Sequence, residues 1–512
     1  MPSFRFSTSM LRYFPGRSGR FPSTWLASLA VIIAFTGLPL AAQPIWLRLQ
    51  CADFSIYTDG SQRDLESVAV TYAAFRQLSR DLLLRPETKV PPSTIILFRR
   101  LDSLKKHSAP IQNSDLTIAA FSTEVDSRIL TALCVAGDRK NAQATLFEFE
   151  TIWTLGRSGY LLPTWIAQGA GQVLSSLEID KSNAILGRDS GRFDHRLSIP
   201  WKRFLEINEA SPEYKGDDDP GAFHGQAWSL MHWVLLNQDN TQERFQRVSK
   251  EHSLLQHGKE VASVLDVPLA TLNREVNKHF RGRLKTRAFP FDEKALRAGW
   301  TISPAPLAEV MINCADLLAS AQKPAEARAE LAQAVALAPE EPEVHEAIAR
   351  LALRENDQET AIAHYRRAIE LGSKNPMSRL RSATARLDES STNGTDLPGN
   401  AGNNAAEAIA EIREVIALEP QNLHAYRLLG RALFLAPKLA EKDLDELTPG
   451  LVPGDAGSHV RYYRALLYAR LNIFDRATDD LNTIVADPSV SANERRAAKS
   501  LLARLPKPSA QR

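Results

Sequence analysis

Two stretches of the chain carry side chains that could do acid–base or metal chemistry. Glu150 lies beside Glu148 in the helical pattern "ATLFEFETIW", where a carboxylate can act as a general base. His224 lies in "FHGQAWSLMHW", eight residues before His232, and a neutral imidazole is a common metal ligand. A metal site built from His224 with Glu148 or Glu150 is therefore one hypothesis. The alternative, which we favour, is that His224 is a hydrogen-bonded packing residue.

A longer frame surrounds these two stretches. The segments "WLRLQCADFSIYTDGS", "LFEFETIW", "LPTWIAQGAGQ" and "FHGQAWSLMHWVL" follow one another over about residues 45–240. In these segments and their order the chain resembles the peptidase-MA-like domain, a gluzincin-type fold of secreted bacterial proteins that is often joined to tetratricopeptide repeats. The resemblance implies an α+β domain with a first helix of pattern H-E-x-x-H and a second helix close to W-L-N-E-G-x-A-E.

The resemblance also implies where zinc would bind in active members, through two histidines of the first helix and a carboxylate of the second. At these positions stand Phe149, Trp153 and Gln168, while Glu150 keeps the place of the general base. Gln172 replaces a later glutamate of the second helix. Because aromatic rings offer no lone pair to a cation and a Gln carbonyl binds zinc weakly, we predict that the ancestral zinc is lost and that no other cofactor is bound.

Charge and cysteine content exclude two classes of protein. The chain has 512 residues, with 62 Lys and Arg against 60 Asp and Glu, and no dense basic block outside its N-terminus, so nucleic acid is not a predicted partner. Three cysteines, Cys51, Cys134 and Cys314, are too few for a disulfide-dense scaffold. A pair between Cys51 and Cys134 stays open, although we favour buried free thiols.

The N-terminus has the pattern of an export signal. Four arginines and no acid precede the mostly apolar run from Trp25 to Ala42, which ends in "GLPLAAQP". We predict that residues 1–42 are a signal peptide cleaved after Ala42, and that the protein is periplasmic or extracellular. The alternative is an uncleaved anchor in the inner membrane, the one case in which a membrane would be a partner.

Residues 45–290 have the mixed pattern expected of the α+β domain. Apolar runs predict strands in "FSIYTDG", "STIILFRR", "LTIAAFST" and "RILTALCVAG", and "SVAVTYAAFRQLSRDLLL" has helical periodicity. From Ala142 onward the pattern is helical, through "LFEFETIWTLG", "PTWIAQGAGQVLSSLE", "PWKRFLEI" and "FHGQAWSLMHWVLLN".

Residues 300–505 contain an internal repeat. Ala327, Leu331 and Ala334 recur 34 residues later as Ala361, Tyr365 and Ala368, which is the tetratricopeptide period. The next copy, from Ala408, is displaced by a polar insertion at 388–404. We predict about five repeats in an all-α solenoid with a concave groove, closed by the helix "ANERRAAKSLLARL".

Cationic and aromatic side chains gather at the repeat positions that usually face such a groove. They are Arg350, Arg354, His424, Arg427, Arg431, His459, Tyr462 and Arg470. Arginine forks suit carboxylates, so the predicted partner is a protein or peptide, with acidic segments as candidates. An ordinary solvated polar face is an equally good interpretation of these residues.

Together these patterns predict an exported, non-catalytic interaction protein. It would combine a gluzincin-like α+β domain with a degenerate zinc motif and a tetratricopeptide solenoid. The competing hypothesis is an active hydrolase of the zinc metallopeptidase kind, with an unorthodox site around Glu150 and His224.

Overall fold

The structure is a computed structural model of the whole chain. It describes residues 45–84, 88, 90–109, 120–126, 128–136, 138–157, 162–188, 197–216, 219, 221–237, 243, 245, 267–281, 284–392, 398–420, 422–452, 455–487 and 490–506. The predicted signal peptide at 1–42 lies outside these residues. Within the described ranges, no helix combines the length and the apolar character needed to cross a bilayer.

The N-terminal region is α/β and contains a mixed six-stranded sheet, in the order β4-β5-β3-β2-β1-β9. Its strands are β1 (Leu47–Gln50), β2 (Phe54–Thr58), β3 (Ser93–Phe98), β4 (Ala120–Val125), β5 (Arg128–Cys134) and β9 (Thr301–Pro304). Strands β2, β3 and β5 are parallel, and the other three pair antiparallel with their neighbours. Strands form in all four predicted stretches, although residues 116–119 of "LTIAAFST" lie outside the described residues, whereas β1 and β9 were not predicted as strands.

In the sheet, β1 from the start of the domain pairs with β9, which directly precedes the repeats. Leu49 of β1 lies opposite Ile302 of β9 on one side and Ile56 of β2 on the other. Ile56 in turn pairs with Ile95 of β3. Strand β9 begins after the predicted domain boundary at residue 300, so the segment that leads into the repeats is itself part of the sheet.

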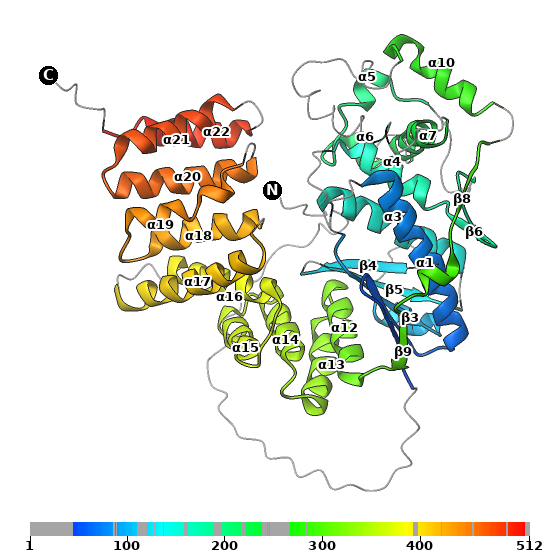
Figure 1. Cartoon of the computed structure of the whole chain (residues 1–512), viewed down its shortest axis with the longest axis horizontal. Helices are drawn as coiled ribbons and strands as arrows, with labels where there is room; N and C mark the ends of the chain where they lie inside the picture. The colour runs from blue at the N-terminus through cyan, green and yellow to red at the C-terminus, as the bar shows by residue number, and fades with distance from the viewer. Residues whose placement is uncertain are drawn as a thin grey trace, which may run out of the picture.

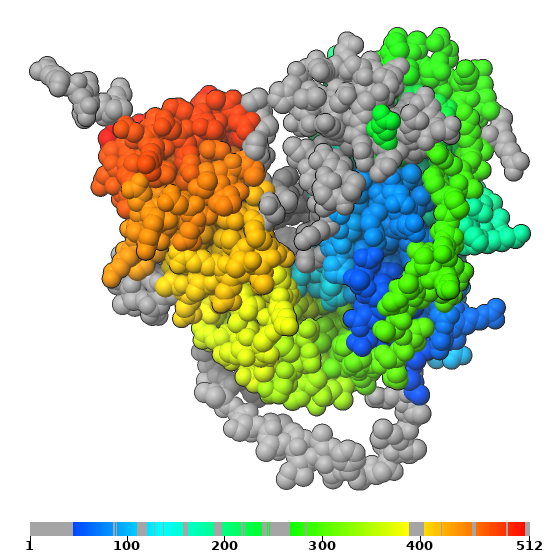
Figure 2. All heavy atoms as spheres, viewed as in Figure 1, coloured from blue at the N-terminus to red at the C-terminus, as the bar shows by residue number. Residues whose placement is uncertain are grey.

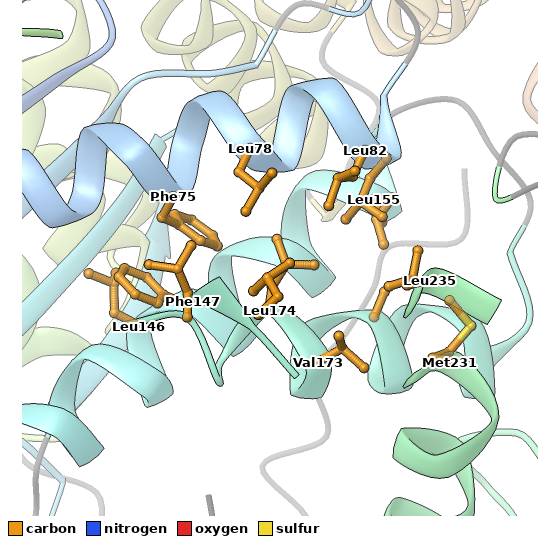
Figure 3. Packing of buried hydrophobic residues seen from close by; sticks show 14 of the residues in the cluster. Phe75, Leu78, Leu82, Leu146, Phe147, Leu155, Val173, Leu174, Met231 and Leu235 are labelled. Carbon is orange, nitrogen blue, oxygen red and sulfur yellow. The ribbon is translucent and has the colours of Figure 1, made fainter. Parts of the chain in front are cut away.

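Two of four long helices, α1 and α3, lie on one face of the sheet, and α4 packs on α3 while α7 packs on α4. The four helices are α1 (Gln62–Leu83), α3 (Arg139–Arg157), α4 (Thr164–Leu174) and α7 (Ala222–Leu236). Figure 3 shows their apolar side chains meeting in one cluster, with Phe75 of α1 stacked on Phe147 of α3 at 4.2 Å between ring centroids. The helical stretches predicted for these segments are confirmed.

Helices α2 (Leu101–Lys106) and α12 (Leu307–Ser320) cover the other face. Val310, Cys314 and Leu317 of α12 belong to one buried cluster with Ile96 and Leu130 of the sheet, because strand residues alternate between the two faces. Figure 2 shows the consequence: the yellow-green atoms of the first repeat helices lie directly against the sheet region.

All three cysteines are free. Cys134 and Cys314 are buried in the cluster beneath α12, and Cys51 packs against the cluster on the opposite face. A Cys51–Cys134 disulfide is therefore not formed.

Smaller elements complete the N-terminal region. A three-stranded antiparallel sheet has the order β6-β7-β8, which corrects the expectation that the region after Ala142 is helical throughout. Short helices accompany it. These elements are β6 (Glu178–Asp180), β7 (Asn183–Leu186), β8 (Arg287–Pro290), α5 (Trp201–Phe204), α6 (Pro212–Lys215), α10 (Leu269–His279) and α11 (Glu293–Leu296).

The C-terminal part is a curved stack of helix pairs (Figure 1). Its elements are α12, α13 (Pro324–Leu337), α14 (Pro342–Arg354), α15 (Gln358–Glu370), α16 (Pro376–Thr392), α17 (Pro398–Leu418), α18 (Leu423–Leu435), α19 (Glu441–Asp445), the 3-10 turn η1 (Thr448–Gly450), α20 (Asp455–Arg470), α21 (Phe474–Ala486) and α22 (Ala492–Leu502). The small and large residues that recur with the 34-residue period are buried, as predicted: Ala327, Leu331 and Ala334 in α13, and Ala361, Tyr365 and Ala368 in α15.

The insertion predicted at 388–404 is largely helical. Helix α16 continues to Thr392 and α17 begins at Pro398, so the polar segment lengthens both helices of the third pair. The fourth pair differs from the other helix pairs because its second helix is the short α19. Gly430 lets α18 approach α20 closely, since a Cβ atom at this position would lie 2.7 Å from the Cβ atom of Tyr463.

Candidate functional site

Helices α3, α4 and α7 hold the residues that the resemblance assigns to a zinc site, and glycines set how closely they pack. A Cβ atom on Gly169 would lie 2.4 Å from the carbonyl oxygen of Ala227 in α7. One on Gly171 would lie 2.9 Å from the carbonyl oxygen of Glu148 in α3. The small residues of "QGAGQ" therefore let α4 lie against both neighbours, with Gln168 and Gln172 at its flanks.

Glu150 forms a buried ion pair with Arg76 of α1. Its carboxylate accepts a hydrogen bond from Arg76 Nη1 at 2.7 Å and another from the Tyr72 hydroxyl, and both the Glu150 and Arg76 side chains are almost fully buried. Arg76 also donates to Ser93 Oγ at 3.0 Å and to the carbonyl oxygen of Pro91 at 3.2 Å. Both Nη atoms of the guanidinium thus have acceptors, while Nε is buried without a hydrogen-bond partner.

The pKa values of the partners agree with this pairing. Burial raises the pKa of Tyr72 well above its ordinary value, and the charge of Glu150 raises it further. Burial acts to lower the pKa of Arg76, but Tyr72 and Glu150 outweigh it, so that this pKa is raised. The arrangement is a neutral phenol beside a permanent ion pair, and it holds α1 against α3.

The other residues of the assigned zinc site point to different partners. Phe149 is half-buried, and Trp153 is buried in the interior. Gln168 donates from Nε2 to the Tyr214 hydroxyl at 3.2 Å, and Gln172 Nε2 lies 3.0 Å from Nδ1 of His224. These side chains form amide, phenol and imidazole contacts between α4, α6 and α7.

The two histidines of α7 lie in separate environments. His224 contacts Gln172, and burial lowers its pKa, which favours the neutral ring. His232 is fully buried, with Nδ1 2.7 Å from Nε2 of His279 and Nε2 3.1 Å from the carbonyl oxygen of Gly187. His232 therefore does not join His224 in one site.

This set of side chains does not fit zinc. Glu150 is paired with Arg76 and His224 contacts Gln172, so each of these side chains has another partner, and a metal site that joins them stays a hypothesis. Among the described residues there is no cluster of three or more His, Cys, Asp and Glu side chains that could hold a metal ion. Glu148 is half-buried, and its side chain faces α4, where a Cβ atom on Gly171 would lie 3.4 Å from its Cγ. The pKa of Tyr214 is raised by burial first, and then by the charges of Glu209 and Glu148.

The second group of candidate residues lies on the first helices of the repeat pairs, and Arg350 is the most deeply placed. Arg350 of α14 is buried and binds both oxygens of Asp316 in α12, through Nε at 3.1 Å and Nη2 at 2.7 Å. Its Nη1 donates to Asp126 at 3.0 Å. Arg350 is thus part of an internal network, which corrects its assignment as an open groove residue.

Asp126 is the unexpected member of this network, because it comes from the α/β region. It lies in the turn between β4 and β5, and its carboxylate also accepts from Arg381 Nε at 2.9 Å and from Asn375 Nδ2 at 3.4 Å. Burial raises its pKa, but Arg350, Arg381 and Arg128 outweigh this and hold the pKa below its ordinary value. The turn between two strands therefore reaches the inner face of the repeats.

Beyond Asp126, cationic and imidazole side chains follow one another along α16 and α18, the first helices of the third and fourth pairs. Partial desolvation and the charges of Arg427 and Arg381 lower the pKa of His424 to about 4, although the residue as a whole is exposed. Arg427 Nη2 lies 2.9 Å from His424 Nδ1 in α18, and Arg381 of α16 is close enough for its charge to act on His424. Arg354 is exposed and donates to Ser320 Oγ at 3.1 Å.

The remaining predicted groove residues have structural partners. Arg431 pairs with Asp388 at 2.7 Å, and His459 Nε2 lies 2.9 Å from Glu494. Arg470 donates to the carbonyl oxygens that end α18, among them Phe434 at 2.9 Å, so it caps that helix. Tyr462 is half-buried against the apolar core of the array.

Sequence reasoning missed Asp126, Arg381 and Asn375. Arg381 lies on the first helix of the third pair, so extending the repeat register to that helix would have found it. Asp126 has φ +55°, a left-handed conformation that Asp and Asn tolerate better than most residues, which marks a tight turn but not its contact with the repeats.

Comparisons with known proteins address the C-terminal part. A family model described as tetratricopeptide repeat matches residues 315–376, from α12 to the start of α16. The C-terminal part contains tetratricopeptide repeats. Such repeats generally mediate protein–protein binding. This match does not extend to residues 45–290, so the resemblance of that part to the peptidase-MA-like domain stays a prediction.

Two solved structures also share similarity with the chain. One is MamA 41-end from Desulfovibrio magneticus RS-1, with 16% identity over 35% of this chain and 94% of that chain, and a TM-score of 0.29. The other is the MamA RS-1 ArsTM double mutant, with 15% identity over 39% of this chain and 98% of that chain, and the same TM-score of 0.29. No curated protein matches the chain.

Because Glu150 forms a buried ion pair with Arg76, we expect its substitution to destabilise the fold. Substitution of a general base without such a partner would not have this effect. Changing Glu150 to Gln should lower the free energy of unfolding by about 3–5 kcal/mol, because it leaves a buried guanidinium without its counter-charge. Urea denaturation followed by circular dichroism measures this. The double variant Arg76→Met, Glu150→Leu is the control and should recover most of the loss. A change within about 0.5 kcal/mol in Glu150→Gln would contradict the prediction.

Proposed function

We propose that this chain is an exported protein-interaction scaffold, whose repeats bind an acidic protein or peptide segment through their inner face. The observation that carries the proposal is the neighbouring set of Arg381, His424 and Arg427 on the first helices of a tetratricopeptide array. Arrays of this kind bind extended segments, and arginine forks favour carboxylates.

The charges on this face support an acidic ligand. With a pKa of about 4, His424 is neutral at pH 7 and offers hydrogen bonds, so the positive charge comes from the arginines. Arg427 contacts His424, and no ion pair of Arg427 with an acid is present among the described residues. Its guanidinium therefore has hydrogen-bonding capacity left for a ligand carboxylate.

Charge reversal at Arg427 tests the groove. In Arg427→Glu, binding of a fluorescent oligoglutamate peptide should weaken about tenfold, because an attraction becomes a repulsion. Fluorescence anisotropy measures the affinity, with an oligoglutamine peptide of equal length as the ligand control. Arg366→Glu is the matched protein control, since Arg366 is exposed on the second helix of its pair. An equal loss in both variants would mean that net charge alone governs binding.

For the N-terminal region we propose a peptidase-like domain retained for its fold, without zinc chemistry. The supporting observation is that each position of the assigned zinc site has another use. Glu150 pairs with Arg76, Gln168 binds Tyr214, and Phe149 and Trp153 contribute apolar surface. An active hydrolase would need a metal or base supplied by other side chains.

Metal analysis separates these two hypotheses. The purified protein without residues 1–42, incubated with zinc and then desalted, should contain far less than one equivalent of the metal, because its donor set is unsuited to it. Inductively coupled plasma mass spectrometry gives the stoichiometry. Stoichiometric zinc that is lost in His224→Gln but kept in His459→Gln would favour the hydrolase.

The proposal that the protein is exported rests on the N-terminal sequence pattern, and identifying the N-terminus of the mature protein tests it. We expect the protein isolated from a bacterial envelope to begin at Gln43, because the apolar run ends in small residues there. Intact-mass spectrometry of the soluble and membrane fractions identifies the terminus. A full-length chain confined to the membrane fraction would instead indicate an uncleaved anchor.

A further inference from the structure

The acid-binding part of the repeat groove already contains a carboxylate of the same chain. We propose that the β4–β5 turn is an internal ligand of the repeats, and that the Asp126 carboxylate competes with an acidic segment of a partner for Arg350 and Arg381. This inference rests on the proposed function, because it concerns the regulation of the same face.

The geometry of Asp126 is that of a bound acidic ligand. Its Oδ2 accepts from Arg350 and Asn375, its Oδ1 accepts from Arg381, and the side chain is about 9% exposed. These three donors come from the second and third helix pairs, whereas the turn belongs to the sheet region. The contact is therefore made between distant parts of the chain, as a contact with a separate peptide would be.

The site does not depend on Asp126 for its shape. Arg350 is held by two hydrogen bonds to Asp316, which would keep its Nη1 directed at the carboxylate position. Asn375 is held by Glu346 at 3.1 Å. An external carboxylate would meet donors that are already oriented, and preorganised donors lower the cost of binding.

Exchange of carboxylates would leave the apolar cores intact. Helix α12 is fixed to the sheet by Val310, Cys314 and Leu317, so the first helix pair stays in place. Asp126 is joined to α14 and α16 by hydrogen bonds to Arg350 and Arg381. Rotation of one aspartate side chain into solvent thus frees Arg381 and Arg350 Nη1 without exposing a buried apolar surface.

Neighbouring cations favour an acidic peptide as the competing ligand. Arg381 contacts Asp126 and its charge acts on His424, which contacts Arg427. The exposed Arg354 lies within electrostatic range of Arg350 and Arg381. A segment with several acidic side chains could place one carboxylate at the Asp126 position and another at Arg427. Asp126 supplies only the first of these contacts.

Removal of the internal carboxylate tests the competition. In Asp126→Asn the turn is kept, because Asn also tolerates the left-handed backbone at φ +55°. Binding of the oligoglutamate peptide should become about tenfold tighter or more, as expected when a site that was mostly occupied is vacated. Asp126→Gly, which also suits this backbone, should show the same gain.

The matched control is Asp388→Asn. It changes the net charge of the array by the same amount and removes a carboxylate from Arg431 at 2.7 Å, away from the turn. Its affinity for the peptide should stay within about twofold of wild type, because exposed ion pairs contribute little. Far-ultraviolet circular dichroism verifies that each variant is folded. An equal gain in Asp388→Asn and Asp126→Asn would overturn the competition.

A measurement on the unaltered protein gives an independent readout. Saturating oligoglutamate should increase hydrogen exchange in the peptide that spans 120–128, because the turn loses its contact with the repeats, and oligoglutamine should not. Suppose that the Asp126 variants bind oligoglutamate with wild-type affinity and that the peptide does not change the hydrogen exchange, while Arg427→Glu still weakens binding. The proposal that the β4–β5 turn is an internal ligand is then overturned, and the proposed function stands. If no form of the protein binds oligoglutamate, both are overturned.

Discussion

Helix α12 packs against two cores at once. One side of it places Val310, Cys314 and Leu317 against the sheet, and the other places Met311 and Leu318 against the next helices of the array. Strand β9, two residues before α12, is hydrogen-bonded to β1. The α/β region and the start of the array are therefore joined by a shared interior, and the groove begins at a fixed place beside the β4–β5 turn.

The polar network above α12 follows from this placement. Arg128, Arg350 and Arg381 face Asp126 and Asp316 at the junction, and each of these charges would be costly to bury alone. Mutual hydrogen bonds offset that cost and give the junction a defined geometry. The same geometry suits a carboxylate at this part of the inner face, and in this structure Asp126 supplies it.

Sequence patterns predicted much of the fold. The long helices and the central strands have strong periodicity, and the 34-residue return of small residues identified the repeats before any contact was known. Strands β1 and β9 have four residues each, too few for a clear pattern, and β9 pairs with a strand some 250 positions earlier in the chain. Such pairing depends on the closed fold.

The sequence by itself determined which residues are absent from the assigned zinc positions, because Phe149, Trp153 and Gln168 lack suitable donor atoms in any conformation. It also determined that cations recur on the first helices of the repeats. Only the tertiary structure decided which charges are available. It paired Glu150 with Arg76 and Arg350 with Asp316 and Asp126, partners that lie 74, 34 and 224 positions apart in the chain. A side chain's type sets what it can bind, but its neighbours in space decide whether it is already bound.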